Sequence, residues 1–305
     1  MLMLLVTAAI WGFAFVAQVL GSDHVGAFTF NGLRFVAGGL VLVPVYLLLE
    51  RDRGGLVSPM ERRATTKRTL IGALVAGGVL FAASALQQYG IQLTRDPGRA
   101  GFITGLYIVI TPIVYFLFLR KRSSWNTWVG AVAAVVGLYL LCLREGDGFV
   151  FGVGELLLLL GAFGWTAHML VVDHFVSDVS PLRFSSWQFI FCGLLGLLMA
   201  FLTEEITPVG IWNAKWALLF CSLLSVGVGY TFQMIGQKHC PPTNAAIIFS
   251  MESVFAAVGG VLWNLVASDE WQVNQEILPI GYVGCAVILL GIVISQIPTG
   301  RKGRT

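Results

Sequence analysis

Charged side chains are scarce in this sequence. Asp, Glu, Lys and Arg together make up 11% of the 305 residues, whereas a typical soluble chain contains roughly 25%. A soluble protein needs charge to cover its surface, and 57% of this chain is hydrophobic, so most of its surface must face lipid. The net charge of +3 is too small to indicate nucleic-acid binding, and we expect no such partner.

Signatures of enzymes are missing as well. The sequence has no Walker motif, no HExxH helix, no Cys/His cluster and no G-x-S-x-G elbow. We therefore expect no metal, no cofactor and no ATP-driven step. The cysteines form no CxxC pair and are interpreted as reduced packing residues; they are Cys142, Cys192, Cys221, Cys240 and Cys285.

Long hydrophobic runs, by contrast, fill the chain. A membrane-spanning helix needs about 20 mostly apolar residues, and such runs cover residues 2–20, 27–49, 70–92, 99–119, 125–143, 152–173, 182–202, 214–236, 244–266 and 278–297. The runs are continuous and not alternating, which excludes barrel strands. The sequence therefore predicts an all-α integral membrane protein with ten transmembrane helices. The first run lacks a basic segment before it and is interpreted as a retained span, not a cleaved signal.

The basic residues predict an orientation. If the N-terminus is cytoplasmic, 14 of the 19 Lys and Arg lie in inner segments and only four in outer ones, in agreement with the positive-inside rule. The inner set is Arg51, Arg53, Arg62, Arg63, Lys67, Arg68, Arg120, Lys121, Arg122, Arg183, Lys238, Arg301, Lys302 and Arg304, and the outer set is Arg95, Arg99, Arg144 and Lys215. We expect a multi-pass protein of a bacterial inner membrane with both termini cytoplasmic.

The two halves of the sequence resemble each other. At a shift of 154 residues, FNGLRFVAGG at 30–39 aligns with FSSWQFIFCG at 184–193, and Trp11 aligns with Trp165. At a shift of 145, Gln88 aligns with Gln233. Each half has five spans, an odd number, so the second half enters the membrane in the opposite sense. We expect two inverted five-helix repeats, residues 1–146 and 147–305; an old duplication retained only for packing is the alternative.

Four short motifs are spread over spans one, two, four and nine. They are Trp11-Gly12-x-x-Phe15, Arg34-Phe35, the run 100–107 leading to Pro112, and the run 245–252. With the five-plus-five layout they make the chain resemble the drug/metabolite transporter superfamily, specifically the EamA-like ten-helix transporters. The family usually has Glu-Pro where this chain has Glu252-Ser253, so the proline that would kink span nine is missing. The family also usually has a basic residue before span one, and its absence here predicts a truncated start.

The resemblance implies a transport protein with a central cavity between the halves. In the family the cavity is lined mainly by spans one, three, four, six, eight and nine. Family substrates include amino acids, other metabolites and drugs, so the resemblance does not identify the solute.

Four ionisable residues lie inside the expected spans. Such a group at the bilayer centre costs about 2.5–3.5 kcal/mol on insertion scales and should face protein or water. Glu252, near the middle of span nine, is the candidate for proton or cation coupling, or else a carboxyl that holds two helices together. His168 is either a proton relay or a packing histidine. Arg34 is interpreted as a structural ion pair or a snorkelling side chain, and Glu155 as interfacial.

Uncharged polar and aromatic residues share helix faces in several spans. Trp11, Phe15 and Gln18 fall at i, i+4 and i+7. A lipid-facing amide would leave polar groups unpaired in hydrocarbon, so these faces are expected to line a cavity, with helix–helix contacts as the alternative. The expected cavity residues are Trp11, Phe15, Gln18, Gln87, Gln88, Tyr89, Phe102, Tyr107, Trp165, His168, Tyr230, Gln233 and Glu252.

The sequence therefore favours a secondary transporter, not an enzyme, whose partners are the lipid bilayer and a small-molecule solute. We expect export of small organic metabolites, amino acid-like or drug-like, by alternating access; aromatic rings with a few amides suit neutral or zwitterionic solutes. The alternatives are a non-transporting membrane scaffold and an intramembrane enzyme. The enzyme would need clustered catalytic groups, which the scattered ionisable residues do not supply. Small residues in spans five and ten, such as Gly130 and Gly284, leave open a helix-pairing surface for a homodimer.

Overall fold

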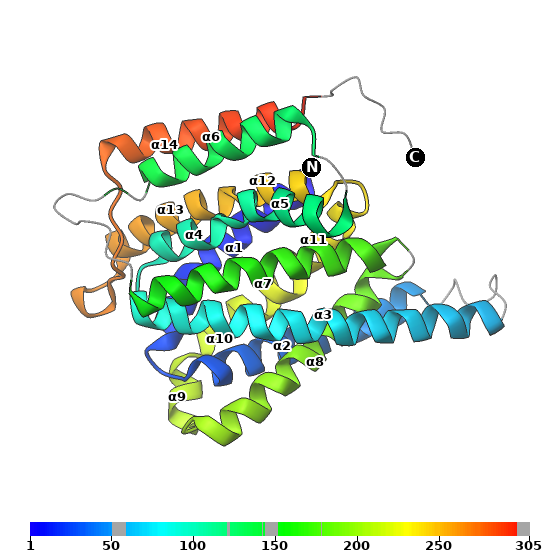
Figure 1. Cartoon of the computed structure of the whole chain (residues 1–305). Coiled ribbons are helices and arrows are strands. Elements are labelled where there is room, and N and C mark those ends of the chain that lie inside the picture. The colour runs from blue at the N-terminus through cyan, green and yellow to red at the C-terminus, as the bar shows by residue number, and fades with distance from the viewer. Residues whose placement is uncertain (51–58, 121–122, 142, 144–151, 178, 298–305) are drawn as a thin grey trace.

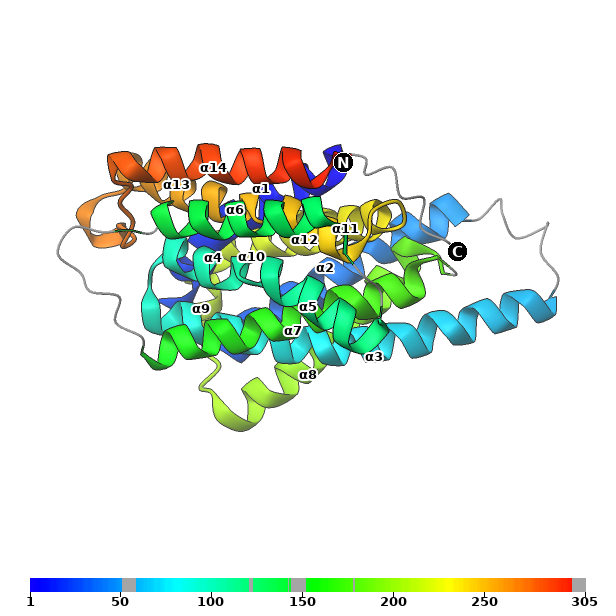
Figure 2. The ribbon, with the colours of Figure 1, turned by 45° about the horizontal axis from the view of Figure 1, so that its top comes forward.

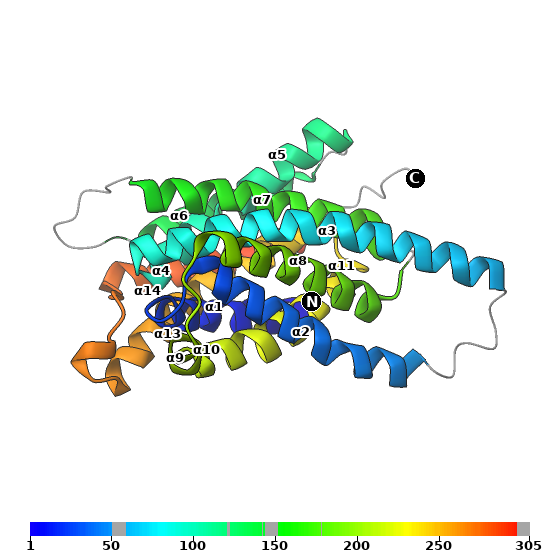
Figure 3. The same cartoon turned by 90° about the horizontal axis from the view of Figure 1, so that it is seen from below.

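The fold is a bundle of helices. The computed structural model describes residues 1–50, 59–120, 123–141, 143, 152–177 and 179–297, and within these ranges every regular element is helical. The long helices lie side by side with their axes along one common direction (Figure 1). The same arrangement is seen after turning the molecule (Figures 2 and 3).

The elements follow the order of the expected hydrophobic runs. The first half contains α1 (Leu2–Ser22), α2 (Ala27–Glu50), α3 (Pro59–Thr94), α4 (Pro97–Gly105), α5 (Tyr107–Leu119) and α6 (Trp125–Leu141). The second half contains α7 (Val153–Val176), α8 (Pro181–Thr203), α9 (Pro208–Asn213), α10 (Lys215–Phe220), the π-helix η2 (Cys221–Tyr230), α11 (Thr231–Gln237), α12 (Pro242–Phe249), α13 (Met251–Val266), the 3₁₀-helix η3 (Asp269–Trp271) and α14 (Pro279–Ser295).

Eight helical segments of the described chain are long and apolar enough to cross a membrane. They correspond to eight of the ten expected runs. The other two runs form α6 and α14, which are apolar but have 17 residues each. At 1.5 Å per residue such a helix is about 25 Å long, against a hydrocarbon core of about 30 Å. The described chain is therefore all-helical, as an integral membrane protein requires, and eight of its ten expected spans are recognised by length and composition.

Helix α3 is longer than its apolar run. Hydropathy predicted a span over 70–92, but the helix begins at Pro59 and continues to Thr94. The added segment contains Met, Glu, Arg, Ala and Lys, which are good helix formers although they are not all apolar. A hydropathy window finds the part of a helix that suits lipid, not the point where the helix begins.

Three of the spanning segments are interrupted. The break between α4 and α5 falls at Leu106, and the break between α12 and α13 falls at Ser250. The second break forms although serine, and not proline, follows Glu252. Instead, the Ser250 hydroxyl donates to the carbonyl oxygen of Ile247 (2.6 Å), and the Ser253 hydroxyl donates to the carbonyl oxygen of Gly101 (2.7 Å). The third interruption is η2, a π-helix within the span that was expected to be continuous.

Helices α6 and α14 pack along each other through glycine (Figure 1). A Cβ atom on Gly130 would lie 2.6 Å from the carbonyl oxygen of Gly291, and one on Gly137 would lie 2.5 Å from that of Gly284. The small residues that we considered as a homodimer surface therefore join two helices of the same chain. Close approach of backbones through glycine is a common way for membrane helices to associate.

Asn126, on α6, caps the C-terminal end of α14. Its Nδ2 donates to the carbonyl oxygens of Ser295 (3.2 Å), Ile294 (3.3 Å) and Ile297 (2.7 Å). We expect Asn126→Ala to lower the free energy of unfolding by about 1–3 kcal/mol, because buried carbonyls lose their donor. Thermal unfolding of the purified protein in detergent measures this. Asn213→Ala, at an exposed asparagine, is the control; equal melting temperatures for both variants would contradict the capping role.

The two ends of the bundle differ in charge. Helix α1 begins and α14 ends at the same end, and α1 and α7 run in opposite directions (Figures 1 and 2). The described basic residues at that end are Lys67, Arg68, Arg120, Arg183 and Lys238. The other end carries Asp23, Asp96, Glu155, Glu204, Glu205, Asp269, Glu270 and Glu276, together with Arg95, Arg99 and Lys215. Cys142 and eight basic residues used to predict the orientation lie outside the described residues; these eight are Arg51, Arg53, Lys121, Arg122, Arg144, Arg301, Lys302 and Arg304. The side chains of Arg62 and Arg63 also lie outside the part of the structure that is described.

Candidate functional site

A central pocket of about 40 Å³ lies where helices from both halves meet. Nine of the expected cavity residues line it: Trp11, Phe15, Gln18, Gln87, Tyr107, Trp165, Tyr230, Gln233 and Glu252. They come from the spans that the family resemblance named for its cavity. The volume is well below the roughly 300–1,000 Å³ of a typical small-molecule site, so an organic solute requires this pocket to widen.

Aromatic rings form one wall of the pocket. The ring centroid of Trp11 lies 4.7 Å from that of Tyr230 and 5.2 Å from that of Phe249. Trp165 lies on the other side of Tyr230, with centroids 6.1 Å apart. The Trp11 Nε1 donates to the carbonyl oxygen of Ser225 (3.2 Å). The indole therefore fixes α1 against η2 and presents its ring to the pocket.

The π-helix decides which residues of span eight face the pocket. Ser225 and Tyr230 are five residues apart, yet both line it together with Gln233. In an α-helix residues five apart point in different directions, whereas a π-helix forms i to i+5 hydrogen bonds and brings them onto one face. The α1 residue Thr7 also binds this segment, since its hydroxyl donates to the carbonyl oxygen of Gly229 (3.1 Å).

Glu252 is the only carboxylate among the pocket-lining residues that the structure describes. Its Oε1 accepts a hydrogen bond from the hydroxyl of Tyr107 (2.9 Å). Tyr107 directly follows the helix break at Leu106, and Glu252 is the second residue after the break at Ser250. The breaks thus bring a phenol and a carboxyl from opposite halves of the chain into contact in the middle of the bundle.

Several polar atoms of the pocket have no hydrogen-bond partner among the described residues. They are Oε1 of Gln18, Oε1 of Gln233, Nε1 of Trp165 and Nε of Arg34. Other polar groups there are paired: Gln87 Nε2 donates to the Thr104 hydroxyl (3.2 Å), and Gln18 Nε2 donates to the Ala14 carbonyl oxygen (3.1 Å). Native proteins rarely leave buried polar atoms unpaired. The pocket therefore offers both donors and acceptors to a polar solute.

Arg34 has no partner, within the part of the chain that the structure describes, for the structural ion pair that we expected from the sequence. Its side chain is 3% exposed, so it does not snorkel to the surface either. The guanidinium carbon lies 4.8 Å from the ring centroid of Phe35 and 5.6 Å from that of Phe30, and the group also contacts the thiol of Cys221. None of the ion pairs between described residues includes it. Whether a buried arginine has a carboxylate partner depends on how the helices pack, and the positions of the spans in the sequence do not show this.

Only one of the three consecutive polar residues in span three reaches the pocket. Successive helix positions differ by about 100°, so Gln87, Gln88 and Tyr89 cannot share a face. Gln88 turns to α1, where its Nε2 donates to the Ser22 hydroxyl (2.8 Å). Tyr89 turns to α2 and donates to Glu204 Oε1 (3.4 Å), while the Glu204 carboxylate also accepts from the backbone N–H groups at the start of α2.

Two other expected cavity residues also lie away from the pocket lining. His168, on α7, contacts α8 through its Nε2, which lies 3.1 Å from Gln188 Oε1. Its ring also contacts the rings of Trp165 and Tyr230. Phe102 is buried in the apolar core. It precedes Thr104 by two positions and so faces the opposite side of α4.

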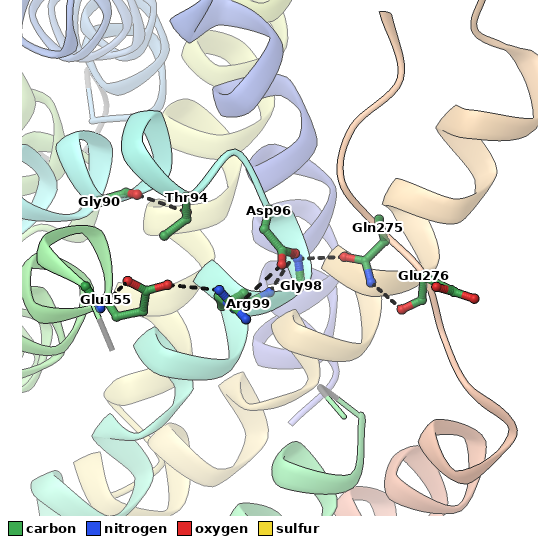
Figure 4. Close-up of polar contacts among 9 residues, drawn as sticks. Gly90, Thr94, Asp96, Gly98, Arg99, Glu155, Gln275 and Glu276 are labelled. Carbon is green, nitrogen blue, oxygen red and sulfur yellow. Dashed lines mark hydrogen bonds and ion pairs between the residues drawn. The ribbon is translucent and has the colours of Figure 1, made fainter. Parts of the chain in front are cut away.

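A polar cluster ties α4, α7 and the 267–278 segment together at the acidic end of the bundle (Figure 4). Arg99 Nη1 lies 3.1 Å from Glu155 Oε1, and the Arg99 backbone N–H donates to Asp96 Oδ1 (3.0 Å). The Gly98 N–H donates to Gln275 Oε1 (2.7 Å). Glu155 also accepts from the Gly152 N–H (3.0 Å) and caps α7. This cluster fixes the start of α4, the helix that carries Thr104 to the pocket.

Six residues that line the pocket were not predicted from the sequence, and helical spacing from predicted residues would have identified four of them. The six are Ala14, Arg34, Thr104, Met169, Ser225 and Phe249. Thr104 and Phe249 each precede a predicted residue by three positions, Ala14 follows Trp11 by three, and Met169 follows Trp165 by four. Within the described chain, no group of three His, Cys, Asp or Glu side chains is placed to hold a metal ion.

Known proteins resemble this chain over nearly its whole length. The model of a family described as the EamA-like transporter family matches residues 1–143 and 152–296. An uncharacterized transporter of Archaeoglobus fulgidus is 27% identical over 292 residues, 95% of this chain and 83% of the relative. The uncharacterized transporter YoaV of Bacillus subtilis is 25% identical over 310 residues, 99% of this chain and 98% of YoaV. One crystal structure has the same fold, with a TM-score of 0.71 at 19% identity, and the match covers 96% of this chain and 95% of the other.

Proposed function

Because the chain belongs to the EamA-like transporter family, we propose that it is a secondary transporter that exports a small organic solute across a bacterial inner membrane by alternating access. The observation that carries this proposal is the central pocket, which combines aromatic walls with unpaired donors and acceptors at mid-span. A site for binding a solute is expected at such a place in transporters built from two halves.

We further propose that the ten apolar helices all cross the membrane, as two inverted repeats over residues 1–146 and 147–305. Contacts between equivalent positions support this. Tyr107 and Glu252 are 145 residues apart, the shift at which spans three and four align with eight and nine, and they are hydrogen-bonded to each other. Residues related by two-fold symmetry meet in this way at the symmetry axis.

The packing of α6 on α14 supports the same symmetry. At a shift of 154, Gly130 corresponds to Gly284 and Gly137 to Gly291. The close contacts are crosswise, Gly130 with Gly291 and Gly137 with Gly284, as expected when each helix occupies the other's place after a half-turn. The two ranges that match the family model also divide the chain between these halves.

The mechanism follows from two similar halves around one pocket. Inverted halves can exchange conformations, so an outward-open and an inward-open state are close in free energy. The breaks at Leu106 and Ser250 and the π-helix η2 all adjoin pocket-lining residues. We propose that these interruptions absorb the movement that widens the pocket toward one side at a time.

The orientation is part of the proposal. The described Lys and Arg residues lie mostly at the end where α1 begins and α14 ends, and acidic residues dominate the other. The positive-inside rule then favours cytoplasmic termini. Under this orientation, the cluster of Arg99, Glu155 and Gln275 (Figure 4) lies on the outer side.

Transport by the purified protein in proteoliposomes tests the proposal. Counterflow of radiolabelled amino acids, nucleosides and organic acids is measured for the wild type and for Gln233→Leu, which removes a pocket amide. We expect the variant to transport at least about tenfold more slowly, because a polar solute loses a buried partner. The matched control is Gln237→Leu, one turn further along α11 and outside the pocket lining. A scaffold would show neither counterflow nor thermal stabilisation by any solute, and that result would refute the proposal.

A further inference from the structure

One full positive charge lies in the centre of the bundle without an ion-pair partner among the described residues. Arg34 lines the pocket, is 3% exposed, and has an Nε atom with no hydrogen-bond partner among the described residues. Its neighbours are the faces of Phe30 and Phe35 and the thiol of Cys221. Arginine does not lose its proton in proteins, and an unpaired charge away from water is strongly unfavourable. Something anionic is therefore expected to complete this site.

The second half of the chain shows what a completed site looks like. At the shift of 154 residues, Arg34 aligns with Gln188 and Ala14 aligns with His168. Gln188 Oε1 lies 3.1 Å from the His168 ring nitrogen, so the second half satisfies this position internally. In the first half the small Ala14 leaves no such partner, and both Ala14 and Arg34 line the pocket. The polar side chain at this position is therefore paired within the protein in the second half, as Gln188, and faces the pocket in the first half, as Arg34.

A second donor faces the same pocket. The indole Nε1 of Trp165 is buried and has no partner among the described residues. Tyr230 lies between this indole and Phe35, with ring centroids 6.1 Å and 6.0 Å away. The planar guanidinium of Arg34 is suited to bind a carboxylate, because its own N–H donors match the geometry of the two oxygens.

We propose that Arg34 binds the carboxylate of the transported solute, and that the solutes of this protein are organic carboxylates with an apolar or aromatic body. The inference rests on the proposed transport function and specifies its substrate class. Trp11, Tyr230 and Phe249 provide the apolar wall for the body of the solute, and the Trp165 indole offers an N–H donor to another polar group of the solute. Glu252, bound to Tyr107, lies in the same pocket; a carboxylate next to it is repelled unless Glu252 carries a proton. Binding of the solute and of a proton are then linked.

Matched pairs of compounds test this assignment. The probes are propionate with propionamide, phenylacetate with phenylacetamide, and indole-3-acetate with indole-3-acetamide, which differ within each pair only in charge and donor pattern. Calorimetry and thermal shift are measured for the wild type, Arg34→Gln, Arg34→Lys and Arg183→Gln. Arg183 is the control because it lies over the Tyr46 ring and not in the pocket lining.

We expect the wild type and Arg183→Gln to bind a carboxylate about 10- to 100-fold more tightly than its amide, as loss of a charge-assisted hydrogen bond predicts. Arg34→Gln should lose this preference, and Arg34→Lys should keep part of it because the charge stays but the fork is lost. Equal binding of both members by the wild type, binding of neither in all three pairs, or an unchanged preference in Arg34→Gln would overturn the assignment. The comparison of compounds on the wild type stands even if Arg34→Gln fails to fold.

Transport measurements separate this inference from the proposed function. If proteoliposomes transport a carboxylate and its amide at equal rates with both the wild type and Arg34→Gln, the protein is a transporter and the role of Arg34 is refuted. If carboxylates bind through Arg34 but no solute crosses the membrane, the site is supported and the transport function is refuted.

Discussion

Replacing Gly12 with alanine is expected to prevent formation of a stable bundle. A Cβ atom at this position would collide with the Cβ of Phe255 and would lie 2.6 Å from the carbonyl oxygen of Glu252 and 2.9 Å from the Ala256 nitrogen. Two of these atoms belong to the backbone of α13, so no side-chain rotation relieves the clash. Inserting a methyl group into a well-packed core costs about 1–3 kcal/mol, occasionally more, and here whole helices must separate. We expect aggregation or a large fall in melting temperature, measured by size-exclusion chromatography and thermal unfolding.

Gly78→Ala is the matched control for this substitution. Gly78 also lies within a spanning helix, but a Cβ atom there would meet nothing within 4 Å. Alanine favours the helix over glycine by about 1 kcal/mol, so this variant should be as stable as the wild type or slightly more so. If Gly12→Ala behaved like Gly78→Ala, α1 and α13 would not be in the close contact described above.

The second large effect is expected at Glu252. The glutamine of Glu252→Gln can still accept the hydrogen bond from Tyr107, so the fold should persist, but the position no longer exchanges a proton. We expect the wild type to accumulate solute in vesicles in response to a pH gradient. The variant should lose this accumulation and retain exchange of labelled for unlabelled solute, because exchange needs no net proton movement. Uptake is measured in proteoliposomes with and without an imposed pH gradient.

Tyr107→Phe distinguishes the role of the Glu252 carboxyl from the role of its hydrogen bond with Tyr107. This variant removes the donor to Glu252 Oε1 and keeps the carboxyl, so coupling should survive although its rate changes. The other ionisable residues that line the pocket with Glu252 are Tyr107, Tyr230 and Arg34, and Tyr107 is the one that donates a hydrogen bond to it. Identical pH dependence of uptake in the wild type and Glu252→Gln would remove Glu252 from coupling.

The spans of this fold are predictable from the sequence because lipid imposes a simple demand. Each apolar run must form a helix to satisfy its backbone, and every expected run coincides with helical structure. Hydropathy does not determine where each helix begins, ends or is interrupted. The start of α3 at Pro59 depends on helix propensity outside the apolar run, and the break at Ser250 depends on hydroxyl groups that bind nearby carbonyls.

The pocket was predictable where residues repeat at α-helical spacing. Trp11, Phe15 and Gln18 share one face and all line it. Three consecutive residues in span three were predicted together, although the helix geometry allows only Gln87 to point inward. Ser225 was missed because its alignment with Tyr230 requires a π-helix, which no hydrophobic period indicates. The environment of Arg34 depends on which residue the second half places opposite it, and only the three-dimensional arrangement determines that.

The crosswise contacts of α6 with α14 restrict how the sequence can drift. Gly130 and Gly137 meet the carbonyl oxygens of Gly291 and Gly284 in the other half, so each contact depends on one residue from each half. A larger side chain at any of the four positions pushes the same pair of helices apart, and a change in one half cannot be compensated within that half. The two helices, although free to change over the rest of their surfaces, must therefore evolve together at these four glycines.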